Sequence, residues 1–90
     1  MNLQQLRYLQ EVVRHGLKIS DAANALYTSQ PGVSKQIRLL EDELGVEIFV
    51  RSGKRIVAVT EPGKTILEIA VRILHEADNL RHIGEEFHAQ

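Results

Sequence analysis

Cysteine and tryptophan are absent from this sequence, and its 90 residues include only two prolines, two tyrosines and two phenylalanines. The lack of cysteine excludes a disulfide framework and a thiolate metal site. With so few aromatic side chains, the core must be built mainly from aliphatic residues. No apolar run is long enough to span a bilayer and no signal peptide is recognisable, so we expect one small soluble domain in the cytoplasm.

The chain also lacks an excess of charge of either sign, because its formal net charge is only −1. Residues 1–60 hold eight Lys and Arg against six Asp and Glu, a net charge of +2, whereas residues 61–90 hold three against six, a net charge of −3. Basic residues are therefore concentrated in the first two thirds of the chain. On its own this is a weak signal for nucleic-acid binding.

The clearest helix signal lies between Tyr27 and Gly45. Ser29 is a good N-cap, Pro31 fits the first turn, and Gly45 supplies the left-handed residue that ends a helix. One side of this helix carries an apolar stripe at helical spacing, made of Val33, Ile37, Leu40 and Leu44.

The other side of that helix is polar near its amino-terminal end. It carries donor-rich side chains that can reach base edges and phosphates, namely Gln30, Ser34, Lys35 and Arg38. The carboxyl-terminal end is acidic, with Glu41, Asp42 and Glu43, and DNA would repel it. The basic amino-terminal half is therefore expected to face a nucleic acid.

A helix is expected at the start of the chain, with Asn2 as its cap and Gln5 returning the bond in a capping box. Gly16 ends this helix. Its buried face is predicted to consist of Leu6, Leu9, Val12 and Val13.

A second, short helix begins at Ile19 and Ser20, with Ser20 as its predicted cap. Only Tyr27 and Thr28 separate it from the cap at Ser29. Two helices joined by so short a turn cross steeply, which is typical of a helix-turn-helix. The alternative is an ordinary helical hairpin inside a bundle, which periodicity alone does not exclude.

Two short β-branched runs follow, at residues 48–50 and 56–59, and a Ser-Gly turn between them predicts a hairpin. The turn holds three cations and no carboxylate: Arg51, Lys54 and Arg55. Beside a helix-turn-helix, such a hairpin is expected to act as a wing that grips the DNA backbone. The alternative is a basic turn that is merely solvated.

Thr60 is expected to cap a last helix, which continues to His88 and is interrupted only by Gly84. A heptad-type repeat runs along this helix, formed by Ile66, Ala70, Ile73, Ala77, Leu80, Gly84 and Phe87. A domain of this size cannot cover so long a helix on every side, so we expect part of this seam to contact the same helix of a second copy. The alternative is that the helix folds back on its own domain.

The remaining motifs give little support for a metal site, a cofactor site or a catalytic site. His75, Asp78 and His82 share a helix face, but nothing supplies a fourth metal ligand. The nucleophile elbow, the P-loop and the dinucleotide-binding pattern are all missing. We therefore expect no metal, no cofactor and no enzymatic activity.

The order of elements and several motifs resemble the amino-terminal DNA-binding domain of LysR-type bacterial transcriptional regulators. The matching residues are Leu6-Arg7-Tyr8, Ala22-Ala23, Ser29-Gln30-Pro31, Ser34-Lys35-Gln36-Ile37, Leu40-Glu41, Leu44-Gly45, Phe49 with Arg51, and Thr60-Glu61-Pro62-Gly63. The resemblance implies a mainly α fold: a winged helix-turn-helix, with a three-helix core and a short β-hairpin wing, followed by a long linker helix for dimerisation.

This resemblance also implies a division of the chain. Residues 1–60 would be the DNA-binding domain, with the helix-turn-helix at about 19–44 and the wing at about 48–59, and residues 61–90 the linker helix. The effector-binding domain of the family has no counterpart here, so a small-molecule effector would act only through that absent domain.

Within the family, the chain most resembles the cysteine-regulon regulators of the CysB type, and Gly32 supports this subgroup. The implied function is binding of inverted repeats in double-stranded promoter DNA as a homodimer, for control of cysteine biosynthesis and sulfur assimilation. The intact protein would be a dimer or a tetramer. The rival hypothesis is a winged-helix module for protein interaction without specific DNA binding.

Site residues can be carried over from the resemblance. Base contacts are expected from Ser29, Gln30, Pro31, Ser34 and Arg38. Phosphate contacts are expected from Lys18, Ser20, Thr28, Lys35, Arg51, Lys54 and Arg55. These assignments require the polar face of the central helix to stand clear of the core, on the same side as the turn at Gly53.

Overall fold

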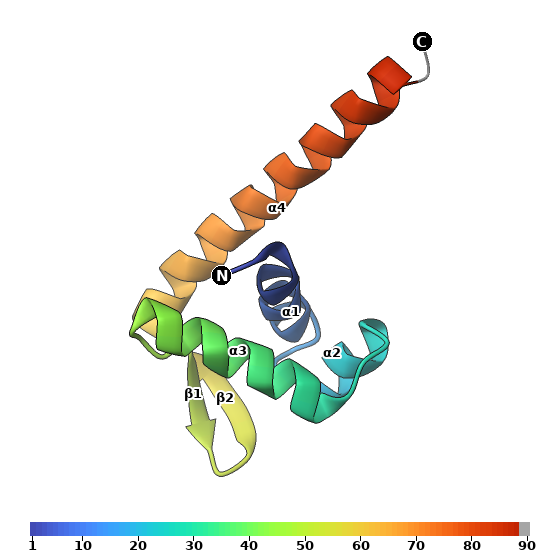
Figure 1. The fold of residues 1–90 in the computed structure, drawn as a ribbon. Coiled ribbons are helices and arrows are strands. Elements are labelled where there is room, and N and C mark those ends of the chain that lie inside the picture. The colour runs from blue at the N-terminus through green and yellow to red at the C-terminus, as the bar shows by residue number, and fades with distance from the viewer. Residues whose placement is uncertain (89–90) are drawn as a thin grey trace.

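Four helices and one antiparallel hairpin make up the computed structural model, which describes residues 1–88 (Figure 1). In chain order the elements are α1 (Leu3–Arg14), α2 (Ile19–Ala25), α3 (Gln30–Leu44), β1 (Phe49–Ser52), β2 (Arg55–Val59) and α4 (Glu61–His88). The predicted mainly α fold and the predicted order of elements are both confirmed.

The core is aliphatic apart from one phenylalanine, as the composition predicts. Helices α1, α2 and α3 pack around it, and the first half of α4 closes one side against α1. Burying one side chain of this size contributes about 1.5–3 kcal/mol. The buried apolar residues are Leu6, Leu9, Val12, Ala22, Ala23, Val33, Ile37, Leu40, Ile48, Phe49, Ile56, Ala70 and Leu74.

Three predicted helix ends are confirmed. The Ser29 hydroxyl accepts a hydrogen bond from the amide of Gly32 at 3.1 Å and caps α3. Gly45 ends the same helix with a φ of 74°, a backbone conformation that glycine adopts without steric cost. The Thr60 hydroxyl accepts from the amide of Gly63 at 3.0 Å and caps α4.

Two predictions about caps are wrong. Asn2 does cap α1, but the side chain of Gln5 donates to Gln36 of α3 at 3.2 Å instead of returning to Asn2. Helix α2 already begins at Ile19, with Lys18 at the cap position and no side-chain cap bond. Ser20 therefore lies inside the first turn, because the chain turns into the helix one residue earlier than its polar residues suggest.

The buried stripe of α3 also differs at its end. Val33, Ile37 and Leu40 are fully buried, but Leu44 is 38% exposed and Glu41 is only 5% exposed. The chain leaves the helix at Gly45, so no element covers Leu44. The segment that enters the wing packs one turn earlier, against Glu41.

The wing is a two-stranded sheet in which β1 pairs with β2, and Ser52 lies opposite Arg55 across the turn. Gly53 adopts a φ of 61° in that turn. The register shifts between Val50 and Arg51, because β2 has one extra residue, Val57, opposite that step. The wing extends away from the core beside α3 (Figure 1).

Helix α4 leaves the domain and projects beyond it, which gives a molecule of 53 × 26 × 20 Å (Figure 1). Its first turn packs tightly against the segment before β1: the Thr60 amide donates to the Ile48 carbonyl at 2.9 Å, and Gly63 is buried beside the same carbonyl. Within residues 1–88, none of the helices combines the length and the apolar character that crossing a membrane requires.

Candidate nucleic-acid interface

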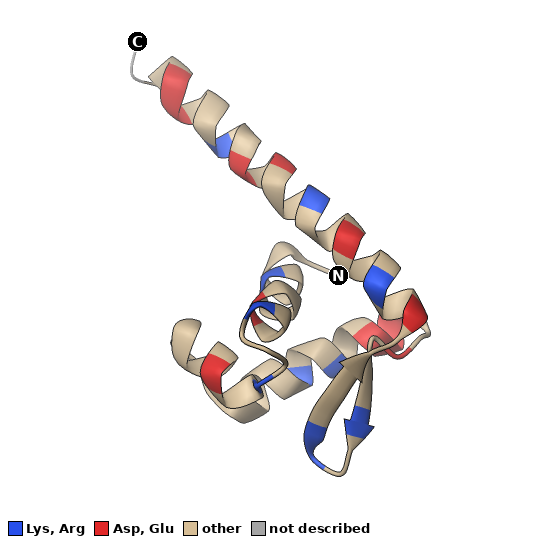
Figure 2. Ribbon diagram, turned by 180° about the vertical axis from the view of Figure 1, so that it is seen from behind, with Lys and Arg blue, Asp and Glu red and all other residues tan. Residues whose placement is uncertain are grey.

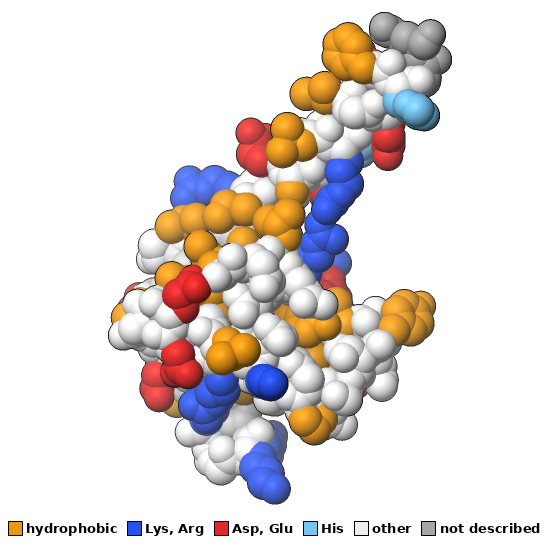
Figure 3. Space-filling view, viewed as in Figure 1, with side chains coloured by type: hydrophobic (Ala, Val, Ile, Leu, Met, Phe, Trp, Pro, Cys, Tyr) orange, Lys and Arg blue, Asp and Glu red, His pale blue; other side chains and the backbone are white. Residues whose placement is uncertain are grey.

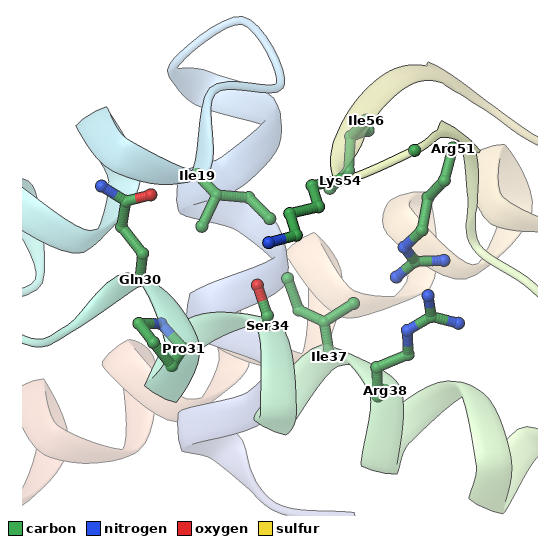
Figure 4. Close-up of a pocket in the computed structure, with 10 residues that line it drawn as sticks. Ile19, Gln30, Pro31, Ser34, Ile37, Arg38, Arg51, Lys54 and Ile56 are labelled. Atoms are coloured by element: carbon green, nitrogen blue, oxygen red, sulfur yellow. The ribbon is translucent and has the colours of Figure 1, made fainter.

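A groove of about 640 Å³ separates the amino-terminal half of α3 from the wing (Figure 4). Its apolar floor includes Ile37 and Ile56, and its polar side chains come from both walls. The residues that line it are Ile19, Gln30, Pro31, Ser34, Ile37, Arg38, Arg51, Gly53, Lys54 and Ile56.

Hydrogen-bond donors dominate this groove. Helix α3 contributes Gln30, Ser34 and Arg38, and the wing contributes Lys54, which points toward α3 in Figure 4. None of the lining residues is acidic. The predicted arrangement, with the polar face of α3 clear of the core and on the same side as the turn at Gly53, is confirmed.

A second, smaller groove of about 330 Å³ joins the loop before α2 to the wing. Lys18 and Ser20 line it on one side, and Lys54 and Arg55 line it on the other. All four residues were expected at phosphates from the sequence, and they share one strongly basic groove. Ser20 lines this groove, although its side chain does not cap α2.

Three other predicted contact residues lie outside both grooves. Ser29 is exposed, with its hydroxyl engaged in capping α3. Thr28 is half-buried in the turn before α3, and Lys35 is exposed on α3 itself. Of the predicted base-contact residues, the first groove thus brings together Gln30, Pro31, Ser34 and Arg38.

Arg51 lines the first groove but is bound to Glu41. Its guanidinium donates to Oε1 of Glu41 at 2.7 Å and to Oε2 at 3.2 Å. The Arg51 side chain is only 16% exposed. The structure therefore gives Arg51 an internal partner, whereas Lys54 and Arg55 at the wing tip remain exposed.

Glu41 is the main residue that the sequence prediction missed. Burial tends to raise the pKa of its carboxyl, but hydrogen bonds from Arg51 and from the amides of Ile48 and Phe49, with the positive charge of Arg51, lower the pKa below its ordinary value. The spacing of Glu41 from Val33 and Ile37 by multiples of four residues, together with the arginine in the next strand, was the available signal.

One part of the predicted seam of α4 is covered by its own domain, and the other part is exposed. Ala70 is buried and Ile66 is half-buried, because α1 and the core cover that side. Farther along, Ile73, Ala77 and Leu80 line an apolar groove with Leu3 and Ile69, two residues that the predicted seam did not include. Figure 3 shows hydrophobic side chains along α4, including its projecting half, where Leu80 is 72% and Phe87 65% exposed; Gly84 is exposed there too.

The histidines of α4 do not form a site in the described part of the chain. His75, Asp78 and His82 are exposed, and Asp78 pairs with Arg81 at 2.7 Å. Within residues 1–88, no group of three potential ligands is close enough to hold a metal ion.

The charge distribution distinguishes the two ends of the molecule (Figure 2). Basic residues occupy the wing tip and the half of α3 beside it, and acidic residues lie at the far end of α3. Helix α4 carries charges of both signs, with the acidic residues in excess. A three-helix core, a polar helix face and an adjoining basic hairpin define a winged helix-turn-helix domain.

The chain belongs to the LysR family of bacterial regulatory helix-turn-helix proteins, whose family model matches residues 3–64. It is 56% identical over 90 residues to the transcriptional regulator CysB of Burkholderia cenocepacia, and 54% identical over 87 residues to the regulator SsuR of the same organism. These alignments cover 100% and 97% of this chain but only 29% and 28% of the two regulators.

Solved structures show the same fold on DNA. The DNA-binding domain of BenM in complex with catB site 1 DNA superposes with a TM-score of 0.90 at 29% identity and covers 100% of this chain and 99% of its own. The DNA-binding domain of CbnR in a DNA complex has a TM-score of 0.86 at 35% identity, covering 96% and 97%. The chain is thus a LysR-type DNA-binding domain.

Proposed function

We propose that this domain reads promoter DNA by inserting the amino-terminal half of α3 into the major groove while the wing grips the backbone. The donor-lined groove between α3 and the wing carries the proposal, since its lining offers amide, hydroxyl, guanidinium and ammonium groups and no carboxylate. Base contacts are assigned to Ser29, Gln30, Pro31, Ser34 and Arg38. Phosphate contacts are assigned to Lys18, Ser20, Thr28, Lys35, Lys54 and Arg55, and Arg51 is omitted because Glu41 holds it.

Footprinting on genomic DNA tests this proposal, combined with mobility shifts over a range of salt concentrations. We expect protected sites with two-fold symmetry, and an affinity that falls as salt rises because phosphate contacts release counterions. Absence of a shift at low salt, together with a stable complex with another protein, would favour the rival protein-interaction module.

Arg38 is the strongest candidate for direct readout, since it is exposed and its guanidinium can bind a guanine edge with two hydrogen bonds. Arg38→Ala should weaken binding to the specific site by about 1–3 kcal/mol. Arg38→Lys keeps the charge but not the two-pronged geometry, so it should retain the salt dependence and lose sequence preference. Titration of specific and scrambled duplexes measures both effects; equal preference in all three proteins would remove Arg38 from the readout.

The wing tip is expected to bind phosphates without reading sequence. Replacing Lys54 and Arg55 together by alanine should weaken binding to all sequences alike and reduce the slope of log affinity against log salt by about 1.8, since each phosphate contributes about 0.9. The matched control replaces Lys64 and Arg81, two exposed cations of α4 that lie outside both grooves. An equal loss in the control would indicate a general effect of net charge.

We also infer that the apolar face of α4 contacts a second copy of the chain in an antiparallel arrangement. The four large apolar residues of the seam are placed symmetrically about the midpoint of Glu76 and Ala77. Reversing the helix there exchanges Ile73 with Leu80 and Ile66 with Phe87, whereas the small residues Ala70 and Ala77 exchange with Ile83 and Glu76. Large apolar residues that keep their places on reversal suit a two-fold interface, in which the same patch is used by both copies. The proposed interface residues are Ile66, Ala70, Ile73, Ala77, Leu80, Gly84 and Phe87, joined by Leu3 and Ile69, with Ile66 and Ala70 already covered in part by their own domain.

Ala77 lies at the centre of this proposed interface. Ala77→Glu should yield monomers, because two carboxylates would be brought together in an apolar seam. His75→Glu is the matched control, since a shift of two residues carries the charge to the opposite side of the helix. Sedimentation should report a monomer for the first variant and a dimer for the control; a dimer of unchanged size in both would place the interface elsewhere.

The genes controlled are proposed to be those of cysteine biosynthesis and sulfur assimilation, supported by 54–56% identity to CysB and SsuR over nearly the whole chain. We also propose that the protein acts in the cytoplasm and works by binding DNA and not by catalysis.

We assign the helix-turn-helix to residues 19–44, the wing to 48–59 and the linker to 61–90, of which 89–90 lie outside the described residues. An effector site is expected outside these ninety residues.

A further inference from the structure

The wing has little support of its own. A two-stranded hairpin is marginally stable in isolation, and only Phe49 and Ile56 of its strands are buried. If the wing is to hold Lys54 and Arg55 at a fixed distance from α3, another contact must fix its direction. The structure has such a contact at the base of β1.

The contact is the carboxylate of Glu41, which receives donors from three residues. Oε2 accepts from the amide of Ile48 at 2.7 Å and from the amide of Phe49 at 3.3 Å. Both oxygens accept from the Arg51 guanidinium, and this bidentate ion pair fixes the orientation of the two side chains. One side chain of α3 thereby binds both the entry to β1 and its third residue.

The position of Arg51 determines that of the wing tip. Arg51 pairs with Ile56 across the sheet, and Ser52 pairs with Arg55 at the turn, so the basic tip begins one residue beyond the ion pair. The pairing register shifts between Val50 and Arg51, opposite the extra residue Val57 of β2, so the irregularity of the wing lies directly at this contact. On α3, Glu41 follows Arg38 by three residues, nearly one helical turn.

We propose that Glu41 is a positioning residue that, by holding Arg51 and the start of β1, sets the distance between the wing tip and the base-reading face of α3. This inference rests on the proposed DNA-binding function. Glu41 contacts no DNA in this scheme. Its role is to allow Lys54 and Arg55 to reach phosphates while Arg38 reaches a base.

Glu41→Gln tests the inference, because glutamine keeps the shape and one acceptor oxygen but cannot bind Arg51 through two charged oxygens. We expect affinity for DNA to fall at least tenfold and the salt slope to fall by about 1.8, the share of two phosphates, with sequence preference retained. Asp42→Asn is the matched control, since it removes the same charge from the next, exposed residue; it should leave both values unchanged.

A double-mutant cycle gives the sharper result. In the Glu41→Gln background, replacing Lys54 and Arg55 by alanine should change affinity less than twofold, because the misplaced tip no longer binds phosphates. An undiminished loss in that background would overturn the inference, as would wild-type affinity for Glu41→Gln. If Glu41→Gln does not fold, Arg51→Lys serves in its place, because lysine keeps the charge but cannot make the bidentate contact with Glu41. This variant should reduce the slope of log affinity against log salt by less than about 1.8.

Amide hydrogen exchange without DNA separates failure of this inference from failure of the proposed function. The amides of Ile48 and Phe49 should exchange faster in Glu41→Gln than in the wild type, and those of α1 should not. Unchanged exchange at both amides would overturn the positioning role even in a protein that binds DNA well. A wild type that binds no DNA at any salt concentration would instead refute the proposed function.

Discussion

Gly63→Ala should destabilise the domain by about 3 kcal/mol or more, the upper range for overpacking a tight site. The added Cβ would overlap the Ile48 carbonyl oxygen, which belongs to the backbone and is already bonded to the amide of Thr60. It would also lie 2.9 Å from the Thr60 hydroxyl and 2.9 Å from Val59. Because backbone atoms cannot rotate away as a flexible side chain can, α4 would have to move as a whole.

Gly84→Ala is the control on the same helix, where a new Cβ meets nothing of its own chain within 4 Å. Because Gly84 belongs to the proposed interface, both glycine variants are compared in the Ala77→Glu background, which is expected to be monomeric. Alanine is the better helix former, so this variant should be more stable by about 0.5–1 kcal/mol. Urea unfolding at one protein concentration measures both variants, with concentration held constant because association adds to stability. Similar stability of Gly63→Ala and the wild type would mean that the α4 junction can yield to an added methyl group without losing its packing.

Removing the Glu41 side chain is expected to have the other large effect. Glu41→Ala should cost about 3–5 kcal/mol, since deleting one partner of a buried ion pair leaves the other charge without compensation. Arg51 is 16% exposed, and the amide of Ile48 also loses its acceptor. Asp42→Ala, one residue away and exposed, should change the free energy of unfolding by less than about 0.5 kcal/mol.

Glu41 should also make stability depend on pH in the acid range. Its pKa is lower in the folded protein than its ordinary value of 4.5, so its contribution is fully present above that pH and is lost as the pH falls through the folded pKa. The difference in unfolding free energy between the wild type and Glu41→Ala should therefore be constant from pH 7 to about 5 and shrink below 4.5. A difference that stays constant to strong acid would contradict the ionised pair.

The helix-turn-helix could be predicted from sequence because local signals agree with tertiary packing there. Ser29 caps α3, Val33 and Ile37 face the core, and Gly45 ends the helix. The polar face of α3 follows from the same periodicity, since residues opposite a buried stripe must face solvent or a partner. The basic turn at Gly53 could likewise be recognised from its composition.

The errors lie where a residue's role depends on a partner distant in sequence. A glutamate in an acidic run is ordinarily solvated, and only its pairing with Arg51, ten residues on, makes burial of Glu41 favourable. Gln5 illustrates the same limitation, because its side-chain amide donates a hydrogen bond to Gln36 of α3 and does not return to the start of its own helix. The heptad seam of α4 could not reveal that α1 covers Ala70, since periodicity identifies a stripe but not its occupant.

The junction of α4 with the segment before β1 has a consequence for operator geometry. Ala77 lies roughly 21 Å along the helix axis from Gly63. If the junction at the Ile48 carbonyl tilted by about 10° in both copies, the proposed two-fold axis would shift by roughly 3.6 Å relative to each domain. The separation of the two DNA-binding surfaces would change by up to roughly 7 Å, about twice the rise of one base pair. The contact between Gly63 and the Ile48 carbonyl would thus fix the angle at which α4 leaves the domain. That angle in turn would select how many base pairs separate the two half-sites.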